Sequence, residues 1–201
     1  MSRGSAEPIA IIGIGCRFPM GASPEEYWRF LCDGGDAVRE IPPDRWDAAA
    51  LYDPNIAAPG KMATRWGAFL DRVDGFDWRA FGISAREAKY VDPQHRLLLE
   101  LGWEALEDAG VPMEAVAGRS VGVFIGIMWP DYARLQAATQ LDGYSVSGGA
   151  LAFAANRLSY FFDLYGPSLS IDVSCASSLV AIHLACRSIR MGSPRLLSQE
   201  A

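Results

Sequence analysis

Cys175 is the residue of this sequence whose type and position are best suited to nucleophilic chemistry. The segment before it, residues 168–173 (SLSIDV), has the composition of a buried strand, and the segment from Cys175 to Met191 has that of a helix. Free N–H groups and the positive end of the helix dipole meet at such a junction, so a thiol there is biased toward the nucleophilic thiolate. Small residues surround it: Ser174, Ala176, Ser177 and Ser178. This pattern predicts a cysteine nucleophile at a strand-to-helix junction, with room for an acyl chain or a sharp turn.

The cysteine count leaves a plainer alternative open. A free cysteine is more often a small packed hydrophobic residue than a nucleophile, and this is how we interpret Cys16, Cys32 and Cys186. No CxxC pair occurs and the chain has two histidines, so we expect no metal site. Four scattered cysteines in an apolar chain of 201 residues are typical of reduced cytosolic thiols rather than of a disulfide framework.

The two histidines, His95 and His183, are poor catalytic partners for Cys175. His183 lies eight positions further along the same predicted helix, more than two turns away, and shares a polar stripe with Arg187 and Arg190. His95 lies in the first turn of another predicted helix. We therefore expect no catalytic part for His95, and a structural or solvent-facing role for His183. A cysteine hydrolase on an α/β scaffold would lack a base, and the glycines of a GxSxG-type elbow are missing as well.

Alternating strands and helices must position Cys175. The sequence predicts buried strands at 9–14, 120–127 and 168–173, and helices at 92–110, 150–161 and 175–191. A shorter helix is predicted to begin after Ser23, as N-cap, and to end at Leu31, whereas residues 33–77 are expected to have little regular structure. The order strand, helix, strand, helix, strand, helix is typical of an α/β domain with a largely parallel sheet.

Composition indicates a globular chain and argues against several classes of binding protein. Half of the residues are hydrophobic and the net charge is −6, without any basic run, so we expect no nucleic-acid partner. The N-terminus lacks the apolar core of a signal peptide and no apolar run reaches transmembrane length, so we expect a cytoplasmic protein that does not bind membranes. The glycines Gly13 and Gly15 do not form a dinucleotide loop, because Phe18 occupies the position of the third glycine.

Several long segments resemble one protein family. DVSCASSLVAIHLA around Cys175, preceded by GPSLSI, closely resembles the active-site segment of ketosynthase domains in modular polyketide synthases. EPIAIIGIGCRFP at residues 7–19 resembles the family's first strand, and FGISAREAKYVDPQHRLLLELGWEALEDAG at residues 81–110 resembles its most recognisable helix. VGVFIG at residues 121–126 and ANRLSYFFDLYGPS at residues 155–168 follow in the family's order. The resemblance covers nearly the whole chain.

The resemblance implies the N-terminal half of a thiolase-like fold, an incomplete α/β domain in which helices cover a largely parallel sheet. Cys175 matches the family's acyl-accepting nucleophile, and its backbone N–H would form part of the oxyanion hole. The implied reaction is a decarboxylative Claisen condensation of the cysteine-bound acyl group with a malonyl-type extender. The implied partners are acyl thioester substrates, an acyl carrier protein that presents phosphopantetheine, and either a second copy in a homodimer or the missing C-terminal half of the domain. No directly bound cofactor is implied.

The sequence departs from the family in three ways. Val173-Ser174 and Ala176 stand where the family usually has Thr-Ala before the cysteine and Ser after it. The family's two catalytic histidines belong to its second half, beyond residue 201. Residues 193–201 (SPRLLSQEA) no longer resemble the family, so we assign residues 1–192 to a partial ketosynthase N-terminal domain and residues 193–201 to a tail outside it.

Two functional hypotheses remain open. In the first, the chain is the N-terminal fragment of a polyketide β-ketoacyl synthase, and alone it is not expected to condense substrates. In the second, it is a catalytically inactive fragment that acts through interaction or dimerisation. The predicted helix 175–191 is apolar almost all round, and in the thiolase-like fold it lies between the two halves of the domain. One broad apolar side of this helix is therefore expected to face water.

Overall fold

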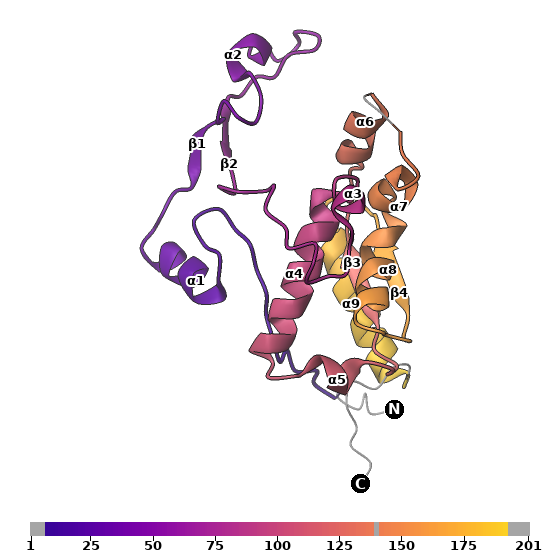
Figure 1. The fold of residues 1–201 in the computed structure, drawn as a ribbon. Helices are drawn as coiled ribbons and strands as arrows, with labels where there is room; N and C mark the ends of the chain where they lie inside the picture. Colours follow the sequence, from indigo (N-terminus) through magenta and orange to yellow (C-terminus); the bar gives the residue numbers. More distant parts are fainter. Residues whose placement is uncertain (1–6, 139–140, 193–201) are drawn as a thin grey trace, which may run out of the picture. The chain divides into compact units, whose positions relative to one another are not determined.

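The chain divides into two compact units, which we describe separately. A computed structural model describes residues 7–138 and 141–192. The smaller unit is Cys16–Val73, and the larger unit combines Met1–Gly15 with Asp74–Ala201 (Figure 1). The tail predicted at residues 193–201 lies outside the described residues. The helices and strands of the larger unit are α3 (Ala85–Ala88), α4 (Pro93–Asp108), α5 (Met113–Val116), β3 (Val123–Gly126), α6 (Asp131–Ala137), α7 (Ser145–Gly149), α8 (Ala152–Phe161), β4 (Ser168–Ile171) and α9 (Ser177–Arg190).

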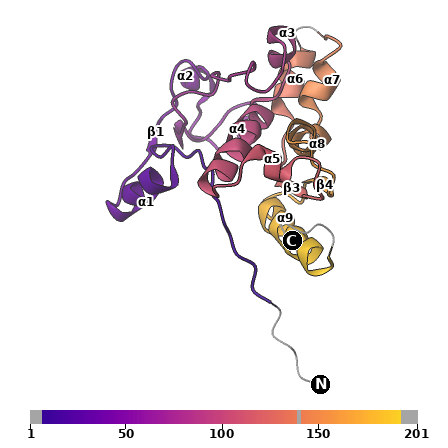
Figure 2. The same cartoon turned by 60° about the horizontal axis from the view of Figure 1, so that its bottom comes forward.

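A parallel pair of strands, β3 and β4, forms the centre of the larger unit. Val123 pairs with Ser168 at one end of the pair, and Gly126 pairs with Ile171 at the other. Helix α9 packs against both strands, and so does α8. The pair lies between α8 and α9, and α4 packs beside α8 (Figure 2). The predicted strands at 120–127 and 168–173 and the predicted helices at 92–110 and 150–161 are thus confirmed, with each strand shorter than expected. The helix predicted at 175–191 is also present, but it begins two residues later than expected.

The hydrophobic core fills the space between β3, α4 and α8. Leu99 of α4 is completely buried, and Leu158 and Phe162 at the end of α8 pack in the same cluster. Val123 of β3 belongs to this cluster as well, which fixes the side of the strand that faces α8. An aromatic group closes one end of the core: Phe76, Phe81, Trp103, Phe161 and Phe162.

Helix α4 begins and ends where the sequence signals predict. The Asp92 side chain caps it by accepting a hydrogen bond from Gln94 N–H at 2.8 Å, and Pro93 occupies the first turn, where its missing N–H costs nothing. Gly110 ends the helix with a positive φ of 65°, a conformation that favours glycine.

The predicted strand at residues 9–14 is wrong. These residues have no strand structure, and Ile11 and Ile12 are 83% and 56% exposed. The segment instead runs along α4: Ile14 N–H donates to the Asp108 carboxylate at 2.8 Å, and a side chain at Gly15 would lie 2.6 Å from the Leu101 carbonyl. An apolar run becomes a strand only when another strand satisfies its backbone groups, and the described part of the chain pairs none with this segment.

The smaller unit has more regular structure than the sequence predicts. Helix α1 (Pro24–Cys32) is confirmed, and Ser23 caps it by accepting from Glu26 N–H at 3.2 Å. Residues 33–77 were expected to be irregular, but they contain α2 (Ala48–Leu51) and an antiparallel pair of strands. The strands are β1 (Val38–Glu40) and β2 (Trp66–Ala68).

The β1–β2 pair joins segments that lie far apart in the sequence, which is why local signals missed it. No two-residue turn connects these strands, because the whole of α2 and its flanking loops lie between them. Two ion pairs support the pair: Arg39 Nη2 lies 2.8 Å from Asp71 Oδ1, and Arg65 Nε lies 3.3 Å from Glu40 Oε1. Both ion pairs are exposed, so they contribute little to stability.

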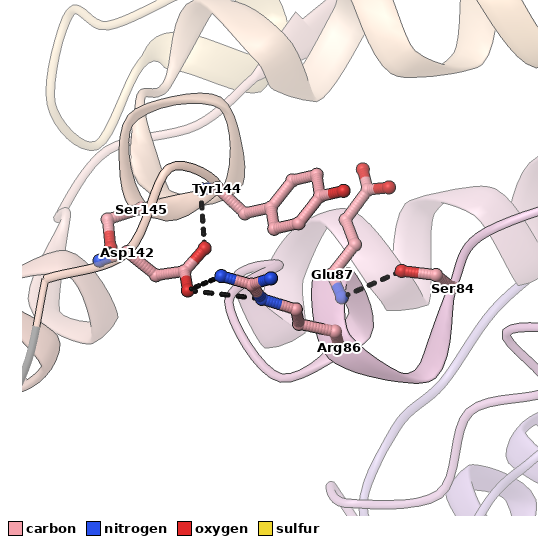
Figure 3. A network of polar contacts seen from close by, with 6 residues as sticks. All are labelled: Ser84, Arg86, Glu87, Asp142, Tyr144 and Ser145. Atoms are coloured by element: carbon pink, nitrogen blue, oxygen red, sulfur yellow. Dashed lines mark hydrogen bonds and ion pairs between the residues drawn. The ribbon is translucent and has the colours of Figure 1, made fainter.

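An arginine–aspartate contact anchors the segment between α6 and α7 to α3 (Figure 3). Arg86 Nη2 and Nε donate to Asp142 Oδ2 at 2.6 and 3.2 Å, while the other carboxylate oxygen accepts from Tyr144 N–H at 3.1 Å. The hydrogen bond from Arg86 holds the pKa of the Asp142 carboxyl below its usual range. The short helices α3, α6 and α7 were not predicted, since each depends on such contacts between distant segments rather than on its own periodicity.

His95 is completely buried in α4, and both of its ring nitrogens lack a hydrogen-bond partner. Burial lowers the pKa of His95 from 6.5 to about 4; the Asp92 carboxylate opposes this shift and the Arg157 guanidinium adds to it. Arg157 in turn donates to Glu87 at 3.0 Å and to the Ser147 carbonyl at 3.1 Å. The imidazole is thus held neutral inside the fold, as a packed group of the core.

Stability should fall in mild acid because of His95. The unfolded chain takes up a proton near pH 6.5, whereas the folded chain resists protonation down to about pH 4. The stabilisation is therefore complete above pH 6.5 and is lost progressively toward pH 4, by about 3 kcal/mol. Urea unfolding at several pH values would measure this slope. His95→Gln should flatten it, whereas His183→Gln, at an exposed position, should leave it unchanged. An equal slope in wild type and His95→Gln would contradict this account.

The expectation that α9 presents an apolar side to water is confirmed. Leu179 is 73% exposed and Ile182 is 60% exposed, and they lie three residues apart on one face of the helix. Both residues lie on the side of α9 that turns away from the sheet, since buried Ala181 and Ser188 take the other side.

This exposed face should make the chain associate. Burying a leucine or isoleucine contributes about 1.5–3 kcal/mol, so two adjacent exposed ones favour self-association. Size-exclusion chromatography with light scattering, together with a dye that binds apolar surface, should detect oligomers or aggregates. The double variant Leu179→Gln/Ile182→Gln should lower both signals. Ile56→Gln, at a residue of the smaller unit that is 89% exposed, is the matched control and should change them less. A dye-negative wild-type monomer would be the opposite outcome.

Candidate active site

Cys175 lies in the turn between β4 and α9, not in the helix itself. The prediction that the helix begins at this cysteine is wrong by two residues, because α9 begins at Ser177. The turn is closed by Ser177: its N–H and its hydroxyl both donate to the Ser174 carbonyl, at 3.1 and 2.6 Å, and its hydroxyl accepts from Val173 N–H at 3.0 Å. These bonds keep the backbone in a tight loop, so the chain cannot enter the helix until after the cysteine.

The Cys175 thiol is exposed at the start of an uncapped helix. Cys175 forms no disulfide, and Ala176 at the N-cap of α9 offers no side-chain cap. The first N–H groups of a helix have no partner inside the helix, and they carry the positive end of its dipole. Ser177 N–H is already bonded to the Ser174 carbonyl, and the dipole of α9 favours a negative charge near its start.

Gly126, at the end of β3, allows the first turn of α9 to lie close to this strand. The sequence analysis does not identify Gly126 as a site residue. A Cβ at this position would lie 2.5 Å from Ser178 N and 2.7 Å from the Ser177 carbonyl carbon, inside the first turn of α9. Any side chain there would push the start of α9 away from the sheet. The signal was present as a glycine that ends an apolar strand (VGVFIG), a place where close backbone approach is common.

The other cysteines and the two histidines differ from Cys175 in their environment. Cys16 is buried and Cys186 is half-buried, as expected for packed residues. Cys32 was interpreted as packed, but it is exposed, because it is the last residue of α1 and that helix buries none of its residues. His183 is exposed on α9, which confirms the expected solvent-facing position, and His95 lies in the core.

Two further observations on the described residues concern metal binding and membrane spanning. No group of three or more His, Cys, Asp or Glu side chains within residues 7–138 and 141–192 is arranged to hold a metal ion. In the same part of the chain, every helix is too short or too polar to cross a membrane.

An apolar cavity of about 250 Å³ lies on the core side of β3, and it is separate from the cysteine turn. It is lined by apolar residues of α4, α8 and the segment leading into β3, among them Leu106, Val123 and Phe162. The lining contains no titratable side chain and no residue of the turn at Cys175. We therefore assign no chemistry to this cavity.

Comparison with known proteins decides the family. The family described as "Beta-ketoacyl synthase, N-terminal domain" matches residues 6–196, nearly the whole chain and all of the Cys175 turn. The chain belongs to this family. Its thiolase-like fold accounts for the parallel pair β3–β4 between helices, and the chain forms part of such a domain.

Large polyketide synthase polypeptides are among the relatives of this chain. It is 48% identical over 188 residues to one phenolphthiocerol/phthiocerol polyketide synthase polypeptide of Mycobacterium tuberculosis. It is 51% identical over 187 residues to another polypeptide of the same synthase from that species. In both cases 92% of this chain is matched, but it spans only 10% of the relative's length.

Solved ketosynthase structures share the fold. The oxazolomycin ketosynthase domain OzmH KS7 of Streptomyces albus JA3453 is 43% identical with a TM-score of 0.85, and the match covers 92% of this chain and 33% of that one. The ketosynthase from module 6 of the bacillaene synthase of Bacillus subtilis 168 is 35% identical with a TM-score of 0.80, covering 92% and 30%. The chain is thus an N-terminal ketosynthase fragment of a polyketide synthase.

Alkylation should single out Cys175. Iodoacetamide should label it ahead of buried Cys16, half-buried Cys186 and also exposed Cys32, because Cys175 has the amides of a helix start beside it. Mass spectrometry of peptides from native protein would give the four rates. Equal rates for Cys32 and Cys175 would contradict the assignment.

A glycine substitution tests whether the turn depends on β3. Gly126→Ala should displace the start of α9 and lower the labelling rate of Cys175 toward that of Cys32. Gly143→Ala is the matched control, since a Cβ at Gly143 meets nothing within 4 Å. If Gly126→Ala labels like wild type, the close contact does not position the thiol.

Proposed function

We propose that Cys175 is the acyl-accepting nucleophile of a polyketide ketosynthase domain. The observation that carries this proposal is the exposed thiol in a hydrogen-bonded turn before an uncapped helix. The turn lies within the part of the chain that matches the beta-ketoacyl synthase family. The domain boundary that we assigned at residue 192 belongs to the same proposal.

The proposed acylation step is a transthioesterification. The Cys175 thiolate attacks the carbonyl carbon of an acyl thioester and forms a carbon–sulfur bond, and the carbonyl oxygen becomes an oxyanion. The backbone N–H of Cys175 would form part of the oxyanion hole that holds it. The bond between the carbonyl carbon and the sulfur of the donor thioester then breaks, and the acyl group stays on Cys175. The donor leaves as a thiolate and takes up the proton that the Cys175 thiol released.

The proposed substrates and partners follow from this chemistry. The donor is an acyl thioester carried on the phosphopantetheine of an acyl carrier protein, which acts as substrate rather than as a bound cofactor. The remainder of the ketosynthase domain would cover the exposed Leu179 and Ile182 of α9. A homodimer of complete domains is the expected assembly.

Condensation needs more than this chain supplies. Forming the carbon–carbon bond requires groups that polarise the extender's carbonyl and hold its developing enolate. The histidines of this chain do not meet that need: His95 is buried in the core, and His183 faces solvent on α9. We infer that the 201-residue chain accepts an acyl group but does not condense it with an extender.

Acyl transfer and condensation can be tested together. Incubation of the chain with a small acyl thioester should add one acyl group, and peptide mass spectrometry should locate it on Cys175. Cys175→Ala should abolish this product, and Cys32→Ala should not. Addition of a malonyl-loaded carrier protein should give no β-ketoacyl product. A condensed product would show that the histidine argument is wrong, and acylation that survives Cys175→Ala would exclude the proposed nucleophile.

The exposed apolar side of α9 favours a second candidate. In this alternative the chain is catalytically inactive and acts through interaction or dimerisation, with Leu179 and Ile182 as the contact residues. The same acylation experiment separates the two candidates, because an interaction fragment would leave Cys175 unmodified under conditions that acylate a complete ketosynthase domain.

A further inference from the structure

Ser174, the residue before Cys175, has a backbone that is held on both sides. Its N–H donates to Asp172 Oδ1 at 3.0 Å, and its carbonyl accepts the two hydrogen bonds from Ser177. These contacts keep Ser174 at a φ of +58°, in the left-handed region that residues other than glycine rarely adopt. The backbone of Ser174 is therefore fixed by the turn.

The Ser174 hydroxyl points at the sulfur of Cys175. The hydroxyl donates toward Cys175 Sγ at an oxygen–sulfur distance of 3.9 Å, a long contact to the weakly accepting sulfur of a thiol. A thiolate carries a full charge and accepts a hydrogen bond more strongly than a thiol.

The hydroxyl of Ser177, another serine of the turn, is not available to donate to the Cys175 sulfur. Ser177 is buried, and its single hydroxyl proton is committed to the Ser174 carbonyl at 2.6 Å. Its oxygen also accepts from Val173 N–H. Ser177 thus shapes the turn, whereas the Ser174 hydroxyl lies 3.9 Å from the Cys175 sulfur and has that sulfur as its acceptor.

We propose that Ser174 is a positioning residue whose hydroxyl donates a hydrogen bond to the Cys175 thiolate and raises the share of the thiol that is ready to attack. This inference rests on the proposed role of Cys175 as nucleophile. Ser174 is also one of the positions at which this sequence departs from the family, which usually has alanine at that position. The proposal gives this departure a functional effect.

The test is the alkylation rate of Cys175 in wild type, Ser174→Ala and Ser174→Gly. In the reaction the thiol proton goes to solvent, the sulfur forms a bond to the carbon of iodoacetamide, and iodide leaves with the electron pair. Loss of the hydroxyl should slow labelling about threefold near pH 7. An ordinary thiol is mostly ionised near pH 10, so the three rates should converge there. The rate of Cys32 in the same samples is the internal control and should not change.

The two variants separate the hydroxyl from the backbone. Both lack the hydroxyl, but only glycine adopts the left-handed conformation without strain. Equal slowing in Ser174→Ala and Ser174→Gly, confined to the lower pH, supports the proposal. Wild-type rates in Ser174→Ala, slowing that persists near pH 10, or slowing in Ser174→Ala alone would each overturn it. Failure of wild-type Cys175 to accept an acyl group would instead contradict the proposed function. Failure of the Ser174 proposal and failure of the proposed function are therefore distinguishable.

Discussion

The first turn of α9 rests directly against the end of β3, and this contact is possible only because Gly126 has no side chain. A Cβ there would lie 2.5 Å from Ser178 N, well inside the distance that two such atoms tolerate. The same helix start receives the chain from β4 through the turn that holds Cys175, and Ser177 closes that turn with its side chain and its backbone. The position of the thiol therefore depends on a close backbone approach at a residue that has no chemistry of its own.

The two faces of the β3–β4 pair are covered in different ways. On the α8 side, Ser170 Oγ accepts from Ala155 N–H at 3.2 Å and Ser168 Oγ accepts from the Ser159 hydroxyl at 2.8 Å, beside a core in which Leu99 is completely buried. On the other side α9 packs against the strands but leaves Leu179 exposed on its outer surface. The described residues thus bury a core on one side of the sheet and present an apolar helix on the other, which is how part of a larger layered domain would look.

The two steps of the proposed chemistry, acyl transfer and condensation, need different groups. Acyl transfer to Cys175 needs an exposed thiol and nearby N–H groups, and the turn before α9 offers both. Condensation needs additional groups around the extender, and a buried neutral His95 and an exposed His183 do not provide them. The chain spans only 10% of the polyketide synthase polypeptides that it matches.

Local signals in the sequence determined the capped helices and the two central strands. Ser23, Asp92 and Gly110 act through neighbours in the chain, so the bounds of α1 and α4 follow from residue types alone. The strand-to-helix junction at Cys175 was predictable for the same reason. Only the tertiary structure decided what depends on distant partners. The apolar segment at residues 9–14 lies along α4 because no strand pairs with it among the described residues, and β1 joins β2 across a long insertion. Gly126 acquires its importance from Ser178, far later in the chain, since close packing between distant segments leaves little mark on the sequence around either one.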